Sequence, residues 1–358
     1  MLRESLPINR LGRSGGITGS VISFSAAVGP LLGAGLLEVG SWRLLFLMNV
    51  PLVAAALFCF TLLRYPQTGG EKKLAVDWVG AGVFAAVLVA VTLVLNGLRG
   101  NESTALLIAG VAILPFLSFL FIQRQLRTET PVAEWALFRN RSYAAATMFV
   151  LLSNLVMYTV ILAIPFFIEE VQHKGHAVSG SLLGAVSILA AFVAPLSGRA
   201  SDAVGRRYPA IAGAALMLVG VIVLFAAIRV DAGYLILAAP LAVLGLGLGL
   251  SIGPSNAAAI ESSPRELAGA AAGTNSMMRY LGSIVGVGIL GAVLNSDSGT
   301  PEIGLFRVIF GVLVVMAALS VVSALFIHRF PAQTSHREAV REEPVGASAL
   351  AASEARNA

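Results

Sequence analysis

Four residues in an apolar stretch near the C-terminus could bind a polar solute inside a membrane. Asn275, Arg279, Gly282 and Gly286 occur in the run "NSMMRYLGSIVGVGILGAVL". At 100° per residue they lie within about 60° of one another on a helix. An arginine near the centre of a membrane span costs about 2.5–3.5 kcal/mol, so we expect this face to meet water or polar partners. The pattern predicts either a solute-binding face or a structural anchor between two helices.

Other apolar runs also contain polar side chains, which we expect to line the same cavity. They are Asn154, Tyr158, Ser181, Ser187, Ser251 and Asn256. The run from Pro209 to Ile228, by contrast, has no polar side chain. A channel, a transporter and a membrane enzyme would all show such an uneven distribution.

Neither catalysis nor metal binding is predicted. His173 and His176 have the spacing to share a metal on a helix, but two solvated loop residues are the favoured interpretation. The single cysteine, Cys59, has no partner for a disulfide or a thiolate site. The carboxylates closest to the apolar runs lie near their ends, where we expect solvation: Asp77, Glu169, Glu170 and Glu261. We therefore expect no enzyme activity, no cofactor and no metal site.

Membrane helices are the elements that must position the polar residues. Hydrophobic residues make up 57 % of the 358 residues and charged residues only 12 %, against about 25 % charged in soluble domains. About 20 apolar residues are needed to cross the bilayer. About ten segments meet this requirement: 16–37, 43–64, 77–98, 104–123, 143–168, 177–198, 209–228, 233–256, 268–294 and 305–328. Because the runs are continuous rather than alternating, we expect an all-α polytopic membrane protein.

The basic residues predict the orientation of these helices. Of the 24 lysines and arginines, eighteen lie on the side that holds both termini, five lie on the other side, and Arg279 lies within a span. The positive-inside rule places the first side, and so both termini, in the cytoplasm. The short basic clusters between apolar runs form no single patch, so nucleic-acid binding is not expected. The polar segment 331–358 is expected to be a disordered cytoplasmic tail.

Glycine and proline occur inside the spans, as in "SAAVGPLLGAG" (25–35). Gly29 and Gly33 share one helix face, where small residues let two helices pack closely in lipid. The same spacing recurs at Gly15/Gly19, Gly180/Gly184, Gly245/Gly249/Gly253, Gly269/Gly273 and Gly282/Gly286. Prolines within spans predict bends, which either allow the bundle to change shape or are static.

One of these stretches resembles a family motif. The run "AAVGPLLGAGLLEVGSWRLLFLMNVP" (26–51) resembles the antiporter motif G-x-x-x-G-P-x-x-G-G in the fifth helix of the major facilitator superfamily. Gly29, Pro30 and Gly33 match it, whereas Ser25 and Ala34 replace two glycines. The W-R-x-x-F-x-x-N-x-P segment that follows is similar to the fourteen-helix drug:proton antiporter branch.

A second motif resembles a cytoplasmic loop of the same superfamily, G-x-x-x-D-R-x-G-R-R. It is "GRASDAVGRR", in which Ala203 replaces an arginine and the matching residues are Gly198, Asp202, Gly205, Arg206 and Arg207. Such a loop pairs charged groups with a helix end and so latches one conformation. Two further runs, "LFRNRSY" and the segment that contains Arg279, also resemble the branch.

The resemblance implies a partial fold of this superfamily that lacks the first four helices. Residues 1–65 would hold the last two helices of the N-terminal bundle, 66–130 two linking helices, 131–330 the C-terminal six-helix bundle, and 331–358 the tail. The acidic residue often tied to proton coupling would be missing.

The implied function is a multidrug-type secondary transporter of the bacterial inner membrane, complete or truncated. Its partners would be the lipid bilayer, a hydrophobic or cationic small molecule, and protons. The alternative is a non-transporting membrane remnant or interaction partner. A membrane enzyme is the least supported class.

Overall fold

The chain folds into membrane-length helices. The computed structural model describes residues 32–33, 35–37, 39–62, 77–97, 104–128, 135–264, 267–294 and 303–328. No strand occurs in these ranges. The elements are α3 (Arg43–Leu47), α4 (Asn49–Leu62), α5 (Trp78–Gly97), α6 (Thr104–Arg127), α7 (Trp135–Phe138), α8 (Arg141–Phe166), the π-helical turn η1 (Phe167–Val171), α9 (His176–Val204), α10 (Arg207–Ala227), α11 (Tyr234–Glu261), α12 (Ala268–Leu294) and α13 (Ile303–Leu325).

Eight helical stretches in the described ranges are long and apolar enough to cross a membrane, and the apolar part of α5, Trp78–Val94, is somewhat shorter. The prediction of an all-α polytopic membrane protein is therefore confirmed. Most of the first expected span, 16–37, lies outside the described residues, as do Gly29, Pro30 and the segment 331–358.

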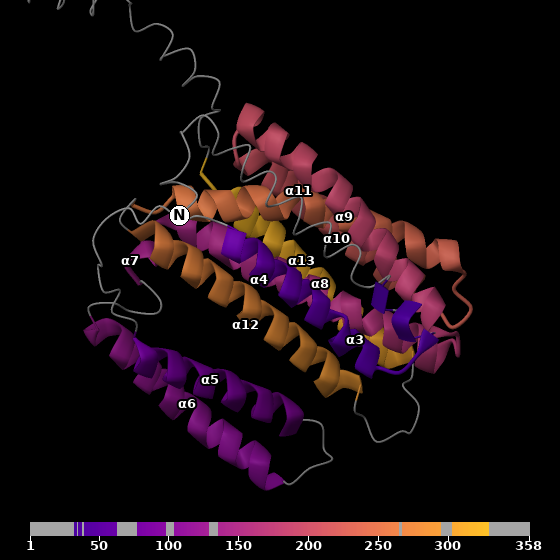
Figure 1. The fold of residues 1–358 in the computed structure, drawn as a ribbon, viewed down its shortest axis with the longest axis horizontal. Helices are drawn as coiled ribbons and strands as arrows, with labels where there is room; N and C mark the ends of the chain where they lie inside the picture. The colour runs from indigo at the N-terminus through magenta and orange to yellow at the C-terminus, as the bar shows by residue number, and fades with distance from the viewer. Residues whose placement is uncertain are drawn as a thin grey trace, which may run out of the picture.

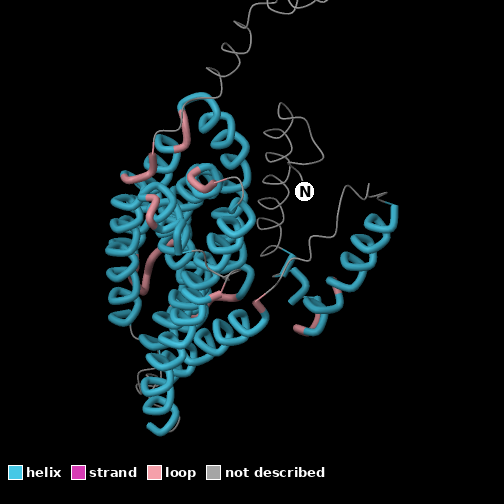
Figure 2. Tube along the Cα trace, turned by 90° about the vertical axis from the view of Figure 1, so that its left-hand side faces the viewer, coloured by secondary structure: helices cyan, strands magenta, loops and turns pink. Residues whose placement is uncertain are grey.

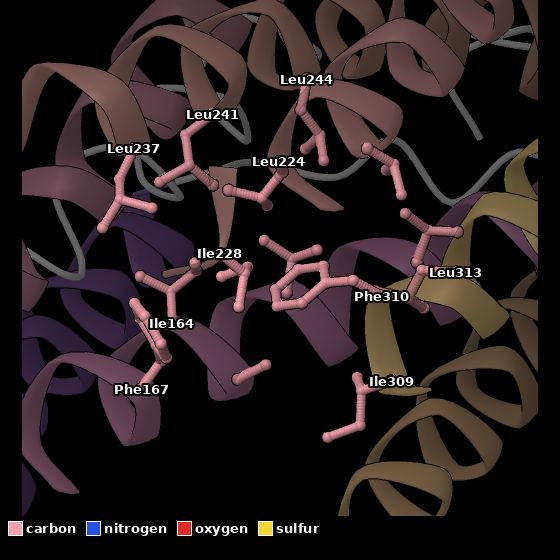
Figure 3. Packing of buried hydrophobic residues seen from close by; sticks show 14 of the residues in the cluster. Ile164, Phe167, Leu224, Ile228, Leu237, Leu241, Leu244, Ile309, Phe310 and Leu313 are labelled. Carbon is pink, nitrogen blue, oxygen red and sulfur yellow. The ribbon is translucent and has the colours of Figure 1, made fainter. Parts of the chain in front are cut away.

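Helices α8 to α13 pack around a common apolar core (Figure 1). Figure 3 shows its centre, where Phe167 from η1, Leu224 from α10, Leu237 from α11 and Phe310 from α13 approach one another. All four side chains are fully buried. Lipid offers apolar groups as good a solvent as the protein does, so this core stabilises the bundle through close packing rather than through exclusion of water.

Glycines allow two helix pairs in the bundle, α8 with α12 and α9 with α11, to touch through their backbones. On α12, a Cβ added to Gly282 would overlap the carbonyl oxygen of Leu151 on α8, and one added to Gly286 would lie 2.6 Å from that of Leu155. On α11, a Cβ added to Gly245 or Gly249 would likewise overlap a backbone carbonyl oxygen of α9. The prediction of close contact is confirmed at these glycines.

The same prediction is wrong for other members of the glycine sets. An added Cβ at Gly253, Gly269 or Gly273 would meet nothing within 4 Å. Gly273 lies on α12, as Gly282 does, but it faces open space. On α10, by contrast, Gly213 lies against Gly247 and Ser251 of α11, so α10 and α11 form a further close contact.

Helices α5 and α6 form an antiparallel hairpin beside α12 (Figure 1). Arg124 Nη2 lies 2.7 Å from Asp77 Oδ1 at one end of the hairpin, and the rings of Phe84 and Phe121 are 5.4 Å apart along it. At the other end, a Cβ on Gly110 would lie 3.3 Å from the backbone nitrogen of Val94. The hairpin is thus closed along its length by its own contacts.

Helix α4 has a different environment. No residue in the apolar stretch Arg43–Thr61 is buried. Figure 2 shows this helix standing apart from the bundle. Large side chains such as Phe58 and Phe60 are therefore exposed.

Candidate transport site

A polar cluster joins α11 to α12. Asn256 Oδ1 accepts a hydrogen bond from Asn275 Nδ2 at 2.8 Å and another from Arg279 Nη2 at 3.1 Å. Asn275 is almost fully buried, with 3 % of its surface exposed. Its Oδ1 and the Nε of Arg279 are buried without a hydrogen-bond partner. The cluster therefore keeps one acceptor and one donor that a bound solute could satisfy.

Helix geometry explains why Arg279 reaches this cluster. Side chains on an α-helix lean toward its N-terminus. Because α12 begins on the membrane side where α11 ends, Arg279 leans toward the last two turns of α11, where Asn256 lies. No carboxylate among the described residues pairs with Arg279, whose hydrogen-bond partner is the neutral Asn256.

The cluster lies at a sparse helix contact. Helix α12 packs mainly on α8, and α11 packs mainly on α9 and α10, whereas α11 and α12 share few contacts. Polar side chains rather than glycines bridge this sparse contact. The contact between α11 and α12 is thus polar, whereas α8 joins both α11 and α13 through the common apolar core.

The other expected cavity residues do not join the cluster by a hydrogen bond. Asn154 donates to the carbonyl of Val150, and Ser181 to that of Val178, each within its own helix. Ser251 donates to Gly247 in the same way and lies against α10. The remaining two, Ser187 and Tyr158, are partly exposed.

One buried hydroxyl beside the cluster was missed by the sequence analysis. Ser255 precedes Asn256, is fully buried, and has no hydrogen-bond partner for its Oγ. Ser255 stands in the sequence like Ser251, which was expected to line the cavity, and only its burial without a partner distinguishes it.

The second motif is only partly a loop. Helix α9 continues to Val204, so Gly198 and Asp202 lie within it; the expectation of a loop at 198–207 is wrong for these positions. The side chain of Asp202 lies outside the described part. The helix ends at Gly205, whose φ of 86° favours glycine because it has no Cβ. Arg207 then begins α10.

Arg206 connects this turn to the end of α11. Its Nη2 lies 2.8 Å from Glu261 Oε1, its Nε lies 3.2 Å from both carboxylate oxygens, and its Nη1 donates to Ser201 Oγ at 2.9 Å. The sequence analysis expected Glu261 to be solvated at a span end, but the carboxylate is the ion-pair partner of Arg206. A cation beside the C-terminus of α11 also complements the helix dipole. We call this pair the latch.

Further hydrogen bonds join helix ends on the same side of the bundle. Asn140 caps α8 by accepting from the Ser142 amide and donates to the carbonyl of Ser262 just after α11. Ser142 Oγ in turn accepts from the amide of His328 after α13. Three helix ends are thus linked beside the latch.

The opposite end of the bundle has its own polar contact. Glu169 Oε1, in η1, lies 2.8 Å from His176 Nδ1 and accepts a hydrogen bond from Ser179 Oγ at 2.8 Å. His176, interpreted as a solvated loop residue, thus begins α9 and has a carboxylate partner. No group of three potential metal ligands occurs in the described ranges.

Comparison with known proteins shows the family of the chain. The model of the Major Facilitator Superfamily matches residues 1–287. This chain therefore belongs to the Major Facilitator Superfamily and is a multi-pass membrane protein. Family membership, rather than any missing side chain, supports the expectation that it is not an enzyme.

Three relatives illustrate the range of names among similar proteins. The uncharacterized transporter YebQ of Escherichia coli (strain K12) is 28 % identical over 304 residues, covering 84 % of this chain and 66 % of the relative. The multidrug resistance protein Stp of Mycobacterium tuberculosis (strain H37Rv) is 30 % identical over 284 residues, covering 79 % and 52 %. The riboflavin transporter RibZ of Clostridioides difficile (strain 630) is 24 % identical over 269 residues, covering 75 % and 58 %. The chain spans about half to two thirds of the length of these relatives.

Proposed function

We propose that this chain acts in secondary active transport of small molecules, as a multidrug-type exporter that uses protons as the coupling ion. Superfamily membership supports transport, and a relative named as a multidrug resistance protein supports the substrate type. The proposal rests chiefly on one observation: Asn256, Asn275 and Arg279 form a polar junction between α11 and α12, two helices that share few other contacts. Hydrophobic or cationic compounds remain the proposed substrates.

In this mechanism the bundles rock about a site near the midplane. The polar junction would contact the solute, and the latch between Arg206 and Glu261 would hold one conformation. The basic residues place the latch in the cytoplasm under the positive-inside rule. The protein would then lie in the bacterial inner membrane with both termini in the cytoplasm.

The finer assignments belong to this proposal as well. They are the fourteen-helix drug:proton antiporter branch and the division at 1–65, 66–130, 131–330 and 331–358. Gly29, Pro30 and Gly33 would shape a helix at the joint between the bundles. The described spans hold no carboxylate near their centres. We therefore propose that the proton-coupling acid lies outside the described residues.

Vesicle transport of the purified chain tests the proposal. We expect Arg279→Gln to lower substrate-driven proton movement at least tenfold while the amount of inserted protein stays the same. Arg307→Gln is the matched control, since Arg307 is an exposed arginine on α13 with no ion-pair partner among the described residues. Equal transport by both variants would remove the junction from the mechanism.

A second candidate is a membrane protein that does not transport on its own. The wholly exposed α4 favours it, because a helix without buried side chains is available to a partner. Vesicles that contain this chain alone would then show no substrate movement. Transport would appear when a complementing membrane protein is added.

A further inference from the structure

A groove opens on the α5–α6 hairpin, at the end where α5 begins and α6 ends. It encloses about 340 Å³. Its walls toward the middle of the hairpin are apolar and consist of Val79, Val83 and Leu120. Its mouth is polar and consists of Gln123, Arg124, Arg127 and Thr128. Polarity therefore changes along the groove, from charged at the end of the hairpin to apolar within the span.

The described residues at the mouth carry a net positive charge. Arg124 is bound to Asp77 through two hydrogen bonds to Oδ1, at 2.7 and 3.0 Å, so these two charges offset each other. Thr128 Oγ1 donates to the carbonyl of Arg124 at 2.9 Å. Arg127 is exposed, and no carboxylate among the described residues pairs with it. Its guanidinium is thus the group that can attract an anion.

The depth of the groove in the membrane indicates the kind of anion. Trp78, at the start of α5, is 78 % exposed, and an exposed tryptophan at a span end is typical of the bilayer interface. The mouth therefore lies at headgroup level and the apolar walls lie along the acyl chains. A free anion would contact the mouth but leave the walls unfilled.

We propose that this groove binds an anionic phospholipid, with its phosphate at Arg127 and the upper part of one acyl chain along Val83 and Leu120. Basic pockets between membrane helices are known to bind anionic headgroups. The inference is independent of the proposed transport function, because none of the groove residues belongs to the polar junction or to the latch.

Fluorescence quenching in vesicles tests the groove. Trp42→Phe and Trp135→Phe leave Trp78 as the single tryptophan of the chain. This protein is reconstituted into phosphatidylcholine vesicles that contain either brominated phosphatidylglycerol or brominated phosphatidylcholine at the same mole fraction. We expect Trp78 to be quenched more strongly by the anionic lipid.

Two substitutions distinguish the groove from general surface charge. Arg127→Gln should lower the preference for phosphatidylglycerol about fivefold, the factor that one basic residue near a membrane surface supplies. Arg139→Gln, which removes another exposed arginine on the same side of the bundle, should leave the preference unchanged. Equal losses in the two variants would overturn the proposal.

A separate arm distinguishes a lipid from a free anion. Excess inorganic phosphate is added at constant ionic strength to vesicles that contain brominated phosphatidylglycerol. Quenching that persists supports the lipid. Quenching that falls to the phosphatidylcholine level would mean that the groove takes phosphate ions, and the lipid proposal would be wrong.

Discussion

Two kinds of helix contact differ sharply within the bundle. Between α8 and α12, Gly282 and Gly286 bring the backbones together with no room for a further side chain. Between α11 and α12, Asn256, Asn275 and Arg279 hold the helices through hydrogen bonds across a sparse contact. The first contact depends on shape and the second on polar partners.

The difference indicates which parts of the bundle can move. A close-packed contact loses many small dispersion interactions at once when it opens. A polar contact can exchange its hydrogen bonds with water or a solute. We infer that α8 moves together with α12 and α9 together with α11, and that the hydrogen bonds of the polar junction rearrange more readily than these close-packed contacts.

The largest expected effect tests the close-packed contact. Gly282→Ala places a methyl group against the carbonyl of Leu151 and should destabilise the protein by about 1–3 kcal/mol, as overpacking does. Gly273→Ala, on the same helix but facing open space, is the control and should have almost no effect. Unfolding in detergent micelles measures the stability of both variants. Similar losses of stability would mean that Gly282 lies in no closer contact than Gly273.

A smaller effect tests the polar junction. In a double-mutant cycle, Asn256→Ala and Arg279→Gln should show a coupling free energy of about 1 kcal/mol, typical of hydrogen bonds between membrane helices. The same cycle with Asn154→Ala in place of Asn256→Ala should show none, because Asn154 bonds within its own helix. Additive effects in the first cycle would mean that the cluster does not join the helices.

The latch should contribute somewhat less, because Glu261 is partly exposed to solvent. Arg206→Gln and Glu261→Gln should couple by about 0.5–1 kcal/mol, and the coupling should fall at high salt. A cycle that pairs Arg207→Gln with Glu261→Gln provides the control. A coupling that salt leaves unchanged would argue against an ion pair.

The smallest effect concerns the hairpin outside the bundle. The Arg124 hydrogen bond, followed by the Gly80 amide, holds the pKa of Asp77 below its usual value. The ion pair therefore stabilises the hairpin above the unfolded-state pKa of about 3.9, and this stabilisation is lost as the pH falls through the lower folded-state value. Thermal unfolding between pH 6 and about pH 3 should show a smaller acid-induced decrease for Asp77→Asn than for the parent chain. An identical decrease would assign the acid sensitivity to other carboxylates.

The fold class could be predicted from the sequence because hydropathy and span length report directly on the membrane. Helix ends were harder to predict, as α9 illustrates. The apolar run stops near Gly198, but the helix continues to Val204, since hydropathy marks where lipid ends and not where backbone hydrogen bonding ends.

Most interaction partners of the site residues could not be predicted from the sequence. The polar face of Asn275 and Arg279 followed from helical periodicity, and both residues do lie in one cluster. Glu261 was interpreted as solvated because its partner Arg206 is 55 positions away and meets it only through the packing of α9, α10 and α11. Gly273 and Gly282 look alike in sequence, and only their neighbours distinguish them.

The length of α9 has a mechanical consequence. Its 29 residues make a rod about 44 Å long, with the turn that carries Arg206 at its tip. Because glycines hold α9 against α11, tilting this rod by about 5° around its far end would displace its tip by about 4 Å and carry Arg206 and Glu261 together. A small rotation at one end of the rod is thus enlarged at the other end, where the arginine and its carboxylate lie, so the rod works as a lever.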